Sequence, residues 1–226
     1  MSQFEKYGVS IYEVIIKTMK YFTMKNSFLL PTILCMLFLT FGCNNEDDNV
    51  EPVVEAGFEN DADGWTITGD AQGGSNLEAS YSPFEGLDNS GYIFAEDNVT
   101  GGVWYFSAPQ KLLGDLSAYS GGTMSYWLIQ ESALDDQFDD RDVILENEDN
   151  RIYYQYEEAT SFPDTTWTGY TLRMVASDRW FNDDDEPASN EEINAVLSNV
   201  TNLYIRGEFQ DGSDTGGLDQ FVLRAN

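Results

Sequence analysis

The strongest constraint on this chain is a period-two alternation of apolar and polar residues, in short runs from Val53 onward. Met124 and Leu128 share one face of the expected strand 122–130, and residues 202–209 alternate in the same way. Gly, Asn, Asp and Ser separate the runs at intervals of roughly 8–12 residues, as they do in sandwiches. The pattern predicts an all-β fold, an antiparallel β-sandwich of the jelly-roll type. The expected strands are 54–58, 64–68, 91–95, 102–107, 122–130, 142–145, 151–156, 166–174, 202–209 and 220–224.

One short amphipathic helix is expected among these strands. Ser189 is followed three residues later by Glu192, which is the spacing of a capping box at a helix N-terminus. The apolar residues that follow at helical spacing are Ile193, Val196, Leu197 and Val200. They form one stripe, so we expect the helix to lie against the edge of the sandwich.

The N-terminal part of the chain predicts an exported protein. Residues 28–41 (FLLPTILCMLFLTF) are apolar and follow two lysines. They are too short to span a membrane, which needs roughly 20 residues, but they match a signal-peptide core of about 7–15. The pair Gly42-Cys43 resembles the lipobox of bacterial lipoproteins, in which the cysteine is acylated. Thr40 and Phe41 depart from that pattern, so a secretory peptide cleaved elsewhere and an uncleaved anchor remain as alternatives.

The chain is therefore divided into a signal peptide (1–42), an acidic tether (43–52) and a β-sandwich domain (53–226). Met24 is a better start for a signal peptide than Met1, since the apolar core follows it closely. The loose lipobox and the acidic tether resemble those of Bacteroidetes surface lipoproteins. The resemblance implies an outer membrane lipoprotein at the surface of a Gram-negative bacterium, with lipid on Cys43 as its membrane anchor.

The charge of the chain excludes several classes of function. With 40 Asp plus Glu against 11 Lys plus Arg, the net charge is −29, so we expect no nucleic acid partner. The absence of histidine removes imidazole-based catalytic triads and imidazole metal sites. Carboxylates remain, and a hydrolase could use a pair of them. The aspartates at 135–142 are the obvious supply, but a run without apolar neighbours is typical of a solvated loop, so we expect no enzyme.

Several blocks resemble one known family. Residues 104–115 (WYFSAPQKLLGD) and 119–126 (YSGGTMSY) are similar to the laminin IV type A domain, also called laminin B. Matching blocks continue in order at 142–145, 194–200, 203–207 and 218–223. The resemblance spans residues 91–223 and implies a jelly roll similar to carbohydrate-binding modules of the galactose-binding-like type. It supplies no catalytic residues.

The opening block 58–65 (FENDADGW) resembles the start of many jelly-roll binding modules. In those folds a glutamate of the first strand and an aspartate near the last strand often share a structural calcium ion. The resemblance implies Glu59 and Asp219 as the ligands. The segment 211–219 is also rich in Asp and Gly, although both residue types are common turn formers. Further carboxylates expected to supply oxygens to calcium are Asp61, Asp63 and Asp97.

Aromatic residues are the other candidates for function. Trp104 and Trp127 belong to strands that match the family, so we expect them in the core or on a sheet face. Trp180 and Phe181 precede an acidic loop and are the candidates for contact with a ligand, with core packing against the helix as the alternative.

These observations predict a non-catalytic, surface-anchored binding module for an extracellular glycan or a matrix protein. The alternative is a structural or assembly subunit of a cell-surface protein complex that binds no glycan.

Overall fold

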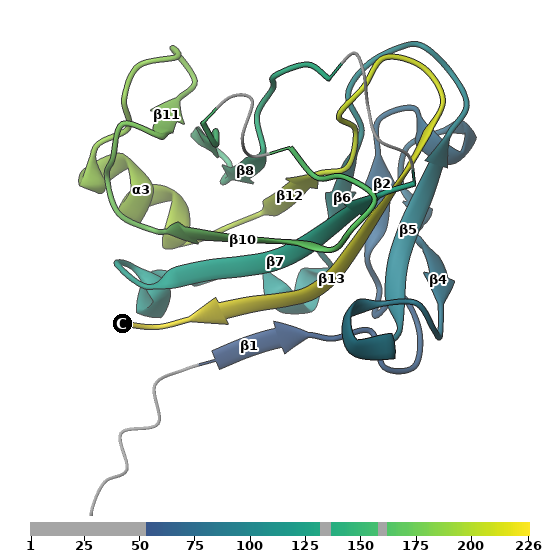
Figure 1. The fold of residues 1–226 in the computed structure, drawn as a ribbon. Coiled ribbons are helices and arrows are strands. Elements are labelled where there is room, and N and C mark those ends of the chain that lie inside the picture. Colours follow the sequence, from purple (N-terminus) through teal and green to yellow (C-terminus); the bar gives the residue numbers. More distant parts are fainter. Residues whose placement is uncertain (1–52, 132–136, 158–161) are drawn as a thin grey trace, which may run out of the picture. The chain divides into compact units, whose positions relative to one another are not determined.

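Two antiparallel β-sheets enclose one core in the computed structural model, which describes residues 53–131, 137–157 and 162–226 (Figure 1). Sheet 1 consists of β1 (Val53–Ala56), β4 (Ser80–Ser82), β5 (Tyr92–Asp97), β7 (Thr123–Gln130), β10 (Thr168–Arg173) and β13 (Asp214–Arg224). Sheet 2 consists of β2 (Thr66–Thr68), β3 (Leu77–Glu78), β6 (Tyr105–Ser107), β8 (Val143–Glu146), β9 (Arg151–Tyr154), β11 (Trp180–Asn182) and β12 (Asn202–Arg206). The expected signal peptide, Cys43 and the tether 43–52 lie outside the described residues.

The strands of sheet 1 run in the order β10-β7-β13-β5-β4, and those of sheet 2 in the order β11-β9-β8-β12-β6-β2-β3. The long strand β13 is the centre of sheet 1. It pairs with β7 along one side, and on the other side with β5 as far as Leu218 and with β1 from Phe221 onward. Its register with β7 shifts between Asp219 and Val222, which is a bulge. On one side of β13, the neighbouring strand thus changes from β5 to β1 around Asp219.

The core fills the space between the sheets with the alternate side chains that the sequence predicts. In β7 every second residue from Met124 is buried, and the residues between them are half-buried. Trp104 lies deep in this core, and its ring occupies the space that a Cβ on Gly207 would need. The same ring contacts Phe106 edge-on, with 5.0 Å between centroids. Gly207 therefore allows the largest side chain of this region to pack between the sheets.

The expected helix is α3 (Asn190–Leu197), and its capping box is formed. The hydroxyl of Ser189 accepts a hydrogen bond from the backbone of Glu192 at 3.2 Å, and the carboxylate of Glu192 accepts one from the backbone of Ser189 at 2.8 Å. Short 3-10 helices cover residues Ala71–Gly73, Leu87–Asn89, Gln110–Leu112 and Ser117–Tyr119. No helix in the described ranges is long and apolar enough to cross a membrane.

The predicted fold class, an antiparallel sandwich with one short helix in the described part of the chain, is confirmed. The sequence did not predict β3, β4 or β11, which have only two or three residues each. The described residues 53–131, 137–157 and 162–226 belong to one compact unit.

Candidate functional site

Asp219 is buried beneath the loop that connects β4 to β5. Its Oδ2 accepts hydrogen bonds from the backbone of Leu87 and the hydroxyl of Ser90, both at 2.8 Å. Its Oδ1 accepts one from the backbone of Gln220 at 2.7 Å. Because Asp219 belongs to the central strand, these bonds fasten the loop 83–91 to sheet 1.

Glu59 lies just after β1, exposed and near Asp219. Burial raises the pKa of the Asp219 carboxyl, its hydrogen bonds lower it, and the negative charge of Glu59 raises it again. A pocket of about 280 Å³ has Glu59, Ser90 and Gln220 in its lining. The charge of Glu59 thus acts on Asp219, and the role of these two residues as calcium ligands stays a prediction.

The neighbouring aspartates are engaged locally. Asp61 Oδ1 accepts a hydrogen bond from the backbone of Asp63 at 2.8 Å, in a turn. The carboxylate of Asp63 forms an ion pair with Lys111. Both aspartates line a pocket of about 300 Å³ together with Glu59. Their role as additional calcium ligands stays a prediction, and Asp97 does not line this pocket.

Asp97 is part of a second group, which we call the carboxylate cluster: Asp70, Asp97, Glu208 and Asp214. Asp97 ends β5 and lies opposite Asp214, the first residue of β13. One carboxylate oxygen each of Asp70, Asp97 and Glu208 lie within 4.8 Å of one another. Burial and the nearby charge of Asp97 raise the pKa of Asp214 to about 7, and burial with the charges of the other three raises that of Glu208 to about 7.

The run 135–142, expected to be a solvated loop, ends in a buried side chain, so that expectation is wrong for Asp142. Asp142 Oδ1 lies 3.5 Å from Nη1 of the fully buried Arg206, and its Oδ2 accepts a hydrogen bond from the backbone of Tyr156 at 2.7 Å. Burial raises the pKa of Asp142 to about 6. The charge run in the sequence concealed this burial. Residues 132–136 lie outside the described ranges.

Trp180 is a core side chain, which corrects its expected contact with a ligand. It is fully buried at the start of β11, where its Nε1 donates a hydrogen bond to the carbonyl of Arg173 at 2.8 Å. Its ring meets that of Tyr154 edge-on. Phe181 is half-buried and stacks on Tyr153, with 5.3 Å between centroids. Pairing of β11 with β9, which the sequence did not predict, draws Trp180 inward.

The outer face of sheet 1 carries half-buried aromatic residues, which we call the aromatic face: Tyr92, Phe94, Trp127 and Trp167. The ring centroid of Tyr92 lies 5.7 Å from that of Phe94 and 5.3 Å from that of Trp167. Trp167 Nε1 donates a hydrogen bond to the carbonyl of Glu85 at 3.1 Å. The loop 83–91 is therefore fixed beside the aromatic face from two sides, by Trp167 and by Asp219.

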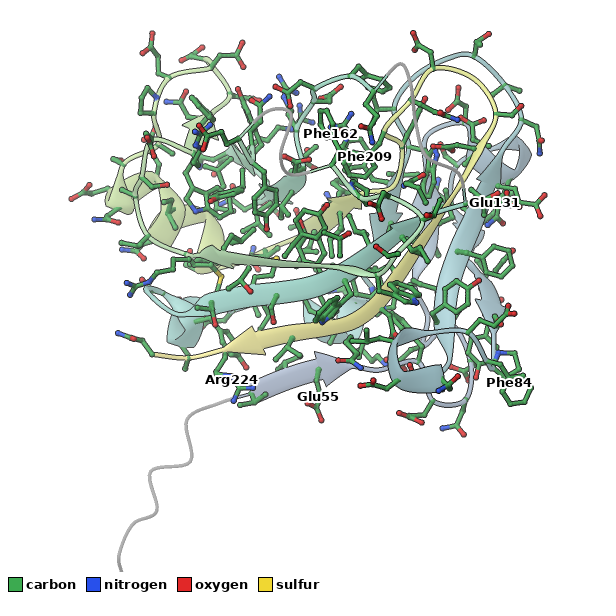
Figure 2. The ribbon with its side chains drawn as sticks, viewed as in Figure 1. Glu55, Phe84, Glu131, Phe162, Phe209 and Arg224 are labelled. Carbon is green, nitrogen blue, oxygen red and sulfur yellow. The ribbon has the colours of Figure 1, made fainter. Side chains whose placement is uncertain are left out.

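Two glycines give these rings room. Gly169 pairs with Trp127, and a Cβ on it would lie 3.1 Å from the indole. A Cβ on Gly217 would lie 3.0 Å from the ring of Tyr92. The rings therefore lie across the backbone of the sheet rather than standing between side chains. Phe84, 69% exposed, projects from the neighbouring loop (Figure 2).

The sequence could have indicated this face, because Tyr92, Phe94 and Trp127 occupy the positions that alternate with the core residues. Trp127 was indeed expected in the core or on a sheet face. The grouping depends on the order of the strands, which the alternation does not give.

The fold and the faces of its sheets define the class of protein, an antiparallel β-sandwich domain of the jelly-roll type. The chain belongs to the laminin B (domain IV) family, whose model matches residues 105–225. The resemblance proposed from the sequence is thus confirmed at the level of the family. No curated protein matches the chain significantly.

Solved structures similar to this one include the L4b domain of human laminin alpha-2, with a TM-score of 0.58 and 10% identity over 77% of this chain and 97% of that one. A family 11 carbohydrate-binding module of a cellulosomal cellulase from Clostridium thermocellum gives a TM-score of 0.44 and 12% identity over 77% and 87%. The adhesin domain of Lys-gingipain from Porphyromonas gingivalis gives 0.38 and 15% over 77% and 99%. At these identities the likeness concerns the fold alone.

Proposed function

We propose that the chain is a non-catalytic binding module that presents the aromatic face to an extracellular glycan. The observation that carries the proposal is the row of half-buried rings across sheet 1, of which Trp167 is hydrogen-bonded to the loop 83–91. Rings of this kind offer large, rigid apolar surfaces at little conformational cost, and the C–H faces of a sugar ring stack on them. A matrix protein that carries such a glycan would be bound by the same surface.

Lipid on Cys43 would hold the module at the outer membrane, with the acidic tether 43–52 as a spacer. This part of the proposal rests on the apolar segment 28–41 and on the resemblance of Gly42-Cys43 to a lipobox. The strongly negative charge of the chain supports it indirectly, because such a chain is repelled by anionic lipid and needs acyl chains to stay at the membrane.

Calcium at Glu59 and Asp219 would stabilise the loop beside the aromatic face. Support comes from the effect of the Glu59 charge on Asp219 and from Gly86, where a Cβ would lie 2.8 Å from Asp219 Oδ2 and so obstruct the approach to it. The ion would neutralise a buried carboxylate and hold the loop 83–91 in one position.

Catalysis is not part of the proposal. The buried carboxylate of Asp142 is paired with Arg206 inside the protein and does not belong to the aromatic face. A hydrolase needs two carboxylates facing one substrate across its scissile bond.

The test is a binding screen of residues 50–226, the compact unit, against insoluble polysaccharides and matrix glycoproteins. We expect Trp127→Ala to weaken binding about tenfold or more, since truncating an aromatic side chain at the centre of an interface removes much of its binding energy. Tyr204→Ala is the matched control, because Tyr204 is a half-buried aromatic residue of sheet 2, where it packs against Tyr105.

Failure of a folded domain to bind any glycan would contradict the proposal. The alternative, a structural or assembly subunit of a surface complex, would then be favoured, and a co-purifying protein partner would support it. Equal losses in Trp127→Ala and Tyr204→Ala would also count against a specific role of the aromatic face.

A further inference from the structure

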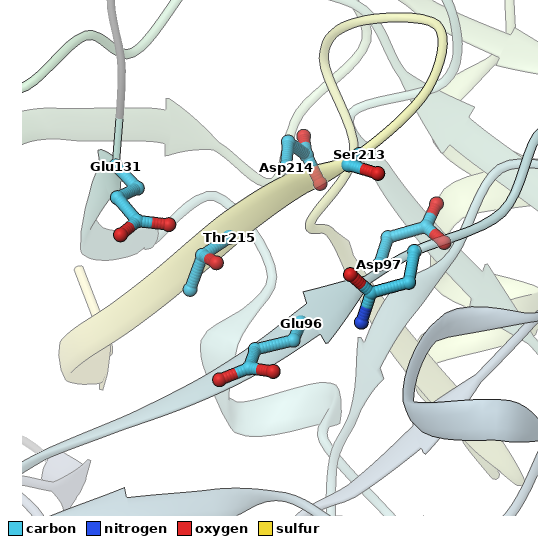
Figure 3. A pocket seen from close by; sticks show the side chains of 7 residues that line it. Glu96, Asp97, Glu131, Ser213, Asp214 and Thr215 are labelled. Carbon is cyan, nitrogen blue, oxygen red and sulfur yellow. The ribbon is translucent and has the colours of Figure 1, made fainter.

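The carboxylate cluster joins the two sheets at one end of the sandwich. Asp97 and Asp214 belong to sheet 1, where they are register partners on adjacent strands (Figure 3). Glu208 comes shortly after β12 and Asp70 shortly after β2, so sheet 2 supplies the other two. Three of the four carboxylates have an oxygen within 4.8 Å of an oxygen of the other two.

Three members of the cluster are buried, Asp70 is half-buried, and several of their carboxylate oxygens make no hydrogen bond of ordinary geometry. Asp97 is 1% exposed, Glu208 3% and Asp214 8%. In the described part of the chain, Asp97 Oδ2 and Asp70 Oδ1 have no hydrogen-bond partner. Asp214 makes no hydrogen bond of ordinary geometry, although the backbone N–H of Phe209 and the indole N–H of Trp104 lie near its carboxylate and lower its pKa. Buried polar groups in native proteins are nearly always paired, and a buried charge needs a counter-charge. These oxygens therefore point to a missing ligand.

Among the residues that the structure describes, Arg206 compensates this charge only in part. Arg206 lowers the pKa of Asp214, but its Nη1 lies beside Asp142 and its Nε and Nη2 donate to the carbonyls of Glu208 and Phe138, both at 2.6 Å. Its guanidinium also stacks on Phe209, which lies 4.4 Å from it. Four carboxylates thus share a cation that already has a partner.

We infer that a divalent cation, for which calcium is the best fit, binds between the two sheets and is held by Asp70, Asp97, Glu208 and Asp214. All these ligands are oxygens, which hard cations prefer. Two oxygens on the same Ca²⁺ lie no more than about 5 Å apart, because each Ca–O distance is about 2.3–2.6 Å. The oxygens of Asp70, Asp97 and Glu208 satisfy this limit, and Asp214 lies beside them as the register partner of Asp97.

The ligand count also fits calcium. The oxygens of Asp70, Asp97 and Glu208 that lie within 4.8 Å of one another supply three ligands, Asp214 would add a fourth, and water would complete the usual 6–8. Water has access through a pocket of about 250 Å³ whose lining includes Asp97, Ser213 and Asp214 (Figure 3).

This site is distinct from the one proposed at Glu59 and Asp219. Asp214 and Asp219 lie five residues apart in β13, a distance of about 17 Å at roughly 3.4 Å per residue. The inference is also independent of glycan binding, because it concerns the inner side of the sheets. An ion here would link sheet 1 to sheet 2 at the end where the loops after β2, β5 and β12 leave the sandwich.

The test uses the full chain, purified in detergent, freed of metal with chelator and kept in physiological salt to screen binding to the acidic surface. Calorimetric titration with CaCl₂ measures affinity and stoichiometry in the wild type and in Asp214→Asn and Glu208→Gln. We expect each substitution to remove one calcium equivalent or to weaken its binding about tenfold or more. Asp211→Asn, in an exposed position three residues from Asp214, is the matched control and should bind as the wild type does.

Two outcomes would overturn the inference: no saturable calcium binding by the wild type, or full binding by both variants. Calcium binding lost in Asp219→Asn but retained in Asp214→Asn would assign the ion to the other site and would overturn it as well. If the variants fail to fold, luminescence of Tb³⁺ in the wild type decides. Excitation through the indole of Trp104, whose backbone donates to Glu208, should sensitise Tb³⁺, and calcium should displace it. A Trp104→Phe variant that keeps the full sensitised signal would place the ion elsewhere.

Discussion

Asp142 and the carboxylate cluster both lie near Arg206, and they differ in how their negative charge is balanced. Asp142 has the guanidinium of Arg206 at 3.5 Å and a backbone donor at 2.7 Å. The carboxylate cluster has four acids and unpartnered oxygens. Burial raises the pKa in both places, to about 6 for Asp142 and to about 7 for Asp214. The comparison teaches that a residue of the same chain balances the charge of Asp142. The carboxylate cluster, by contrast, needs a cation from outside the chain to balance its charge.

The largest effect on the free energy of unfolding is expected at the ion pair between Arg206 and Asp142. Arg206→Met should lower the free energy of unfolding by about 3–5 kcal/mol, because it leaves Asp142 buried without its partner. Chemical denaturation measures the change. The double variant Arg206→Met/Asp142→Leu should recover a large part of the loss. A loss under about 1 kcal/mol in the single variant would mean that the pair does not balance Asp142.

Overpacking beneath the cluster should have the next largest effect. Gly207→Ala places a methyl group in the space of the Trp104 ring, and we expect a loss of about 1–3 kcal/mol. Since the backbone of Trp104 donates to Glu208, calcium binding at the cluster should weaken too. Gly102→Ala is the control, because a Cβ there meets no atom within 4 Å. Equal stability of both variants in thermal denaturation would refute the packing argument.

A pair of isosteric substitutions sharpens the comparison further. In chelator, Asp97→Asn should raise the free energy of unfolding by about 1 kcal/mol, because it removes one of several repelling charges. Asp142→Asn should lower it by a similar or larger amount, since it leaves the buried Arg206 without its counter-charge. With saturating calcium, Asp97→Asn should become destabilising. Effects of the same sign for both variants in chelator would remove the proposed distinction.

The smallest effect belongs to a surface pair. Lys111 and Asp63 form an ion pair with side chains 53% and 34% exposed. Lys111→Met should change the free energy of unfolding by less than about 1 kcal/mol, and less still in high salt. If Lys111→Met lowered the free energy of unfolding as much as Arg206→Met does, solvent exposure would not explain the difference between the two ion pairs.

The fold was predictable because it depends on patterns that are local in the chain. Alternation in 122–130 fixes which side chains of β7 point inward, and the capping box at Ser189 fixes the start of α3. Both follow from neighbours a few residues away. β11 escaped prediction because its three residues become a strand only through pairing with β9, and this pairing also decides that Trp180 is buried.

The sites were less predictable, because they form through contacts between distant segments. Glu59 and Asp219 were identified from a family resemblance, and nothing in their own surroundings in the sequence marks them. Asp70 and Glu208 carry no local signal, since each becomes part of a cluster only when the sheets are packed. Asp214 lies in an Asp-rich segment of the kind that usually forms turns, which conceals its burial.

The position of β13 in sheet 1 has a consequence for biosynthesis. This strand follows every strand with which it pairs, and its partners begin as far back as Val53, which lies opposite Arg224. As the ribosome releases the chain, β1, β5 and β7 emerge without the neighbour that joins them. Pairing over such separations is slow to nucleate. Sheet 1 therefore closes after translation of the domain is complete, and a chain that stops before residue 214 lacks the strand that holds it together.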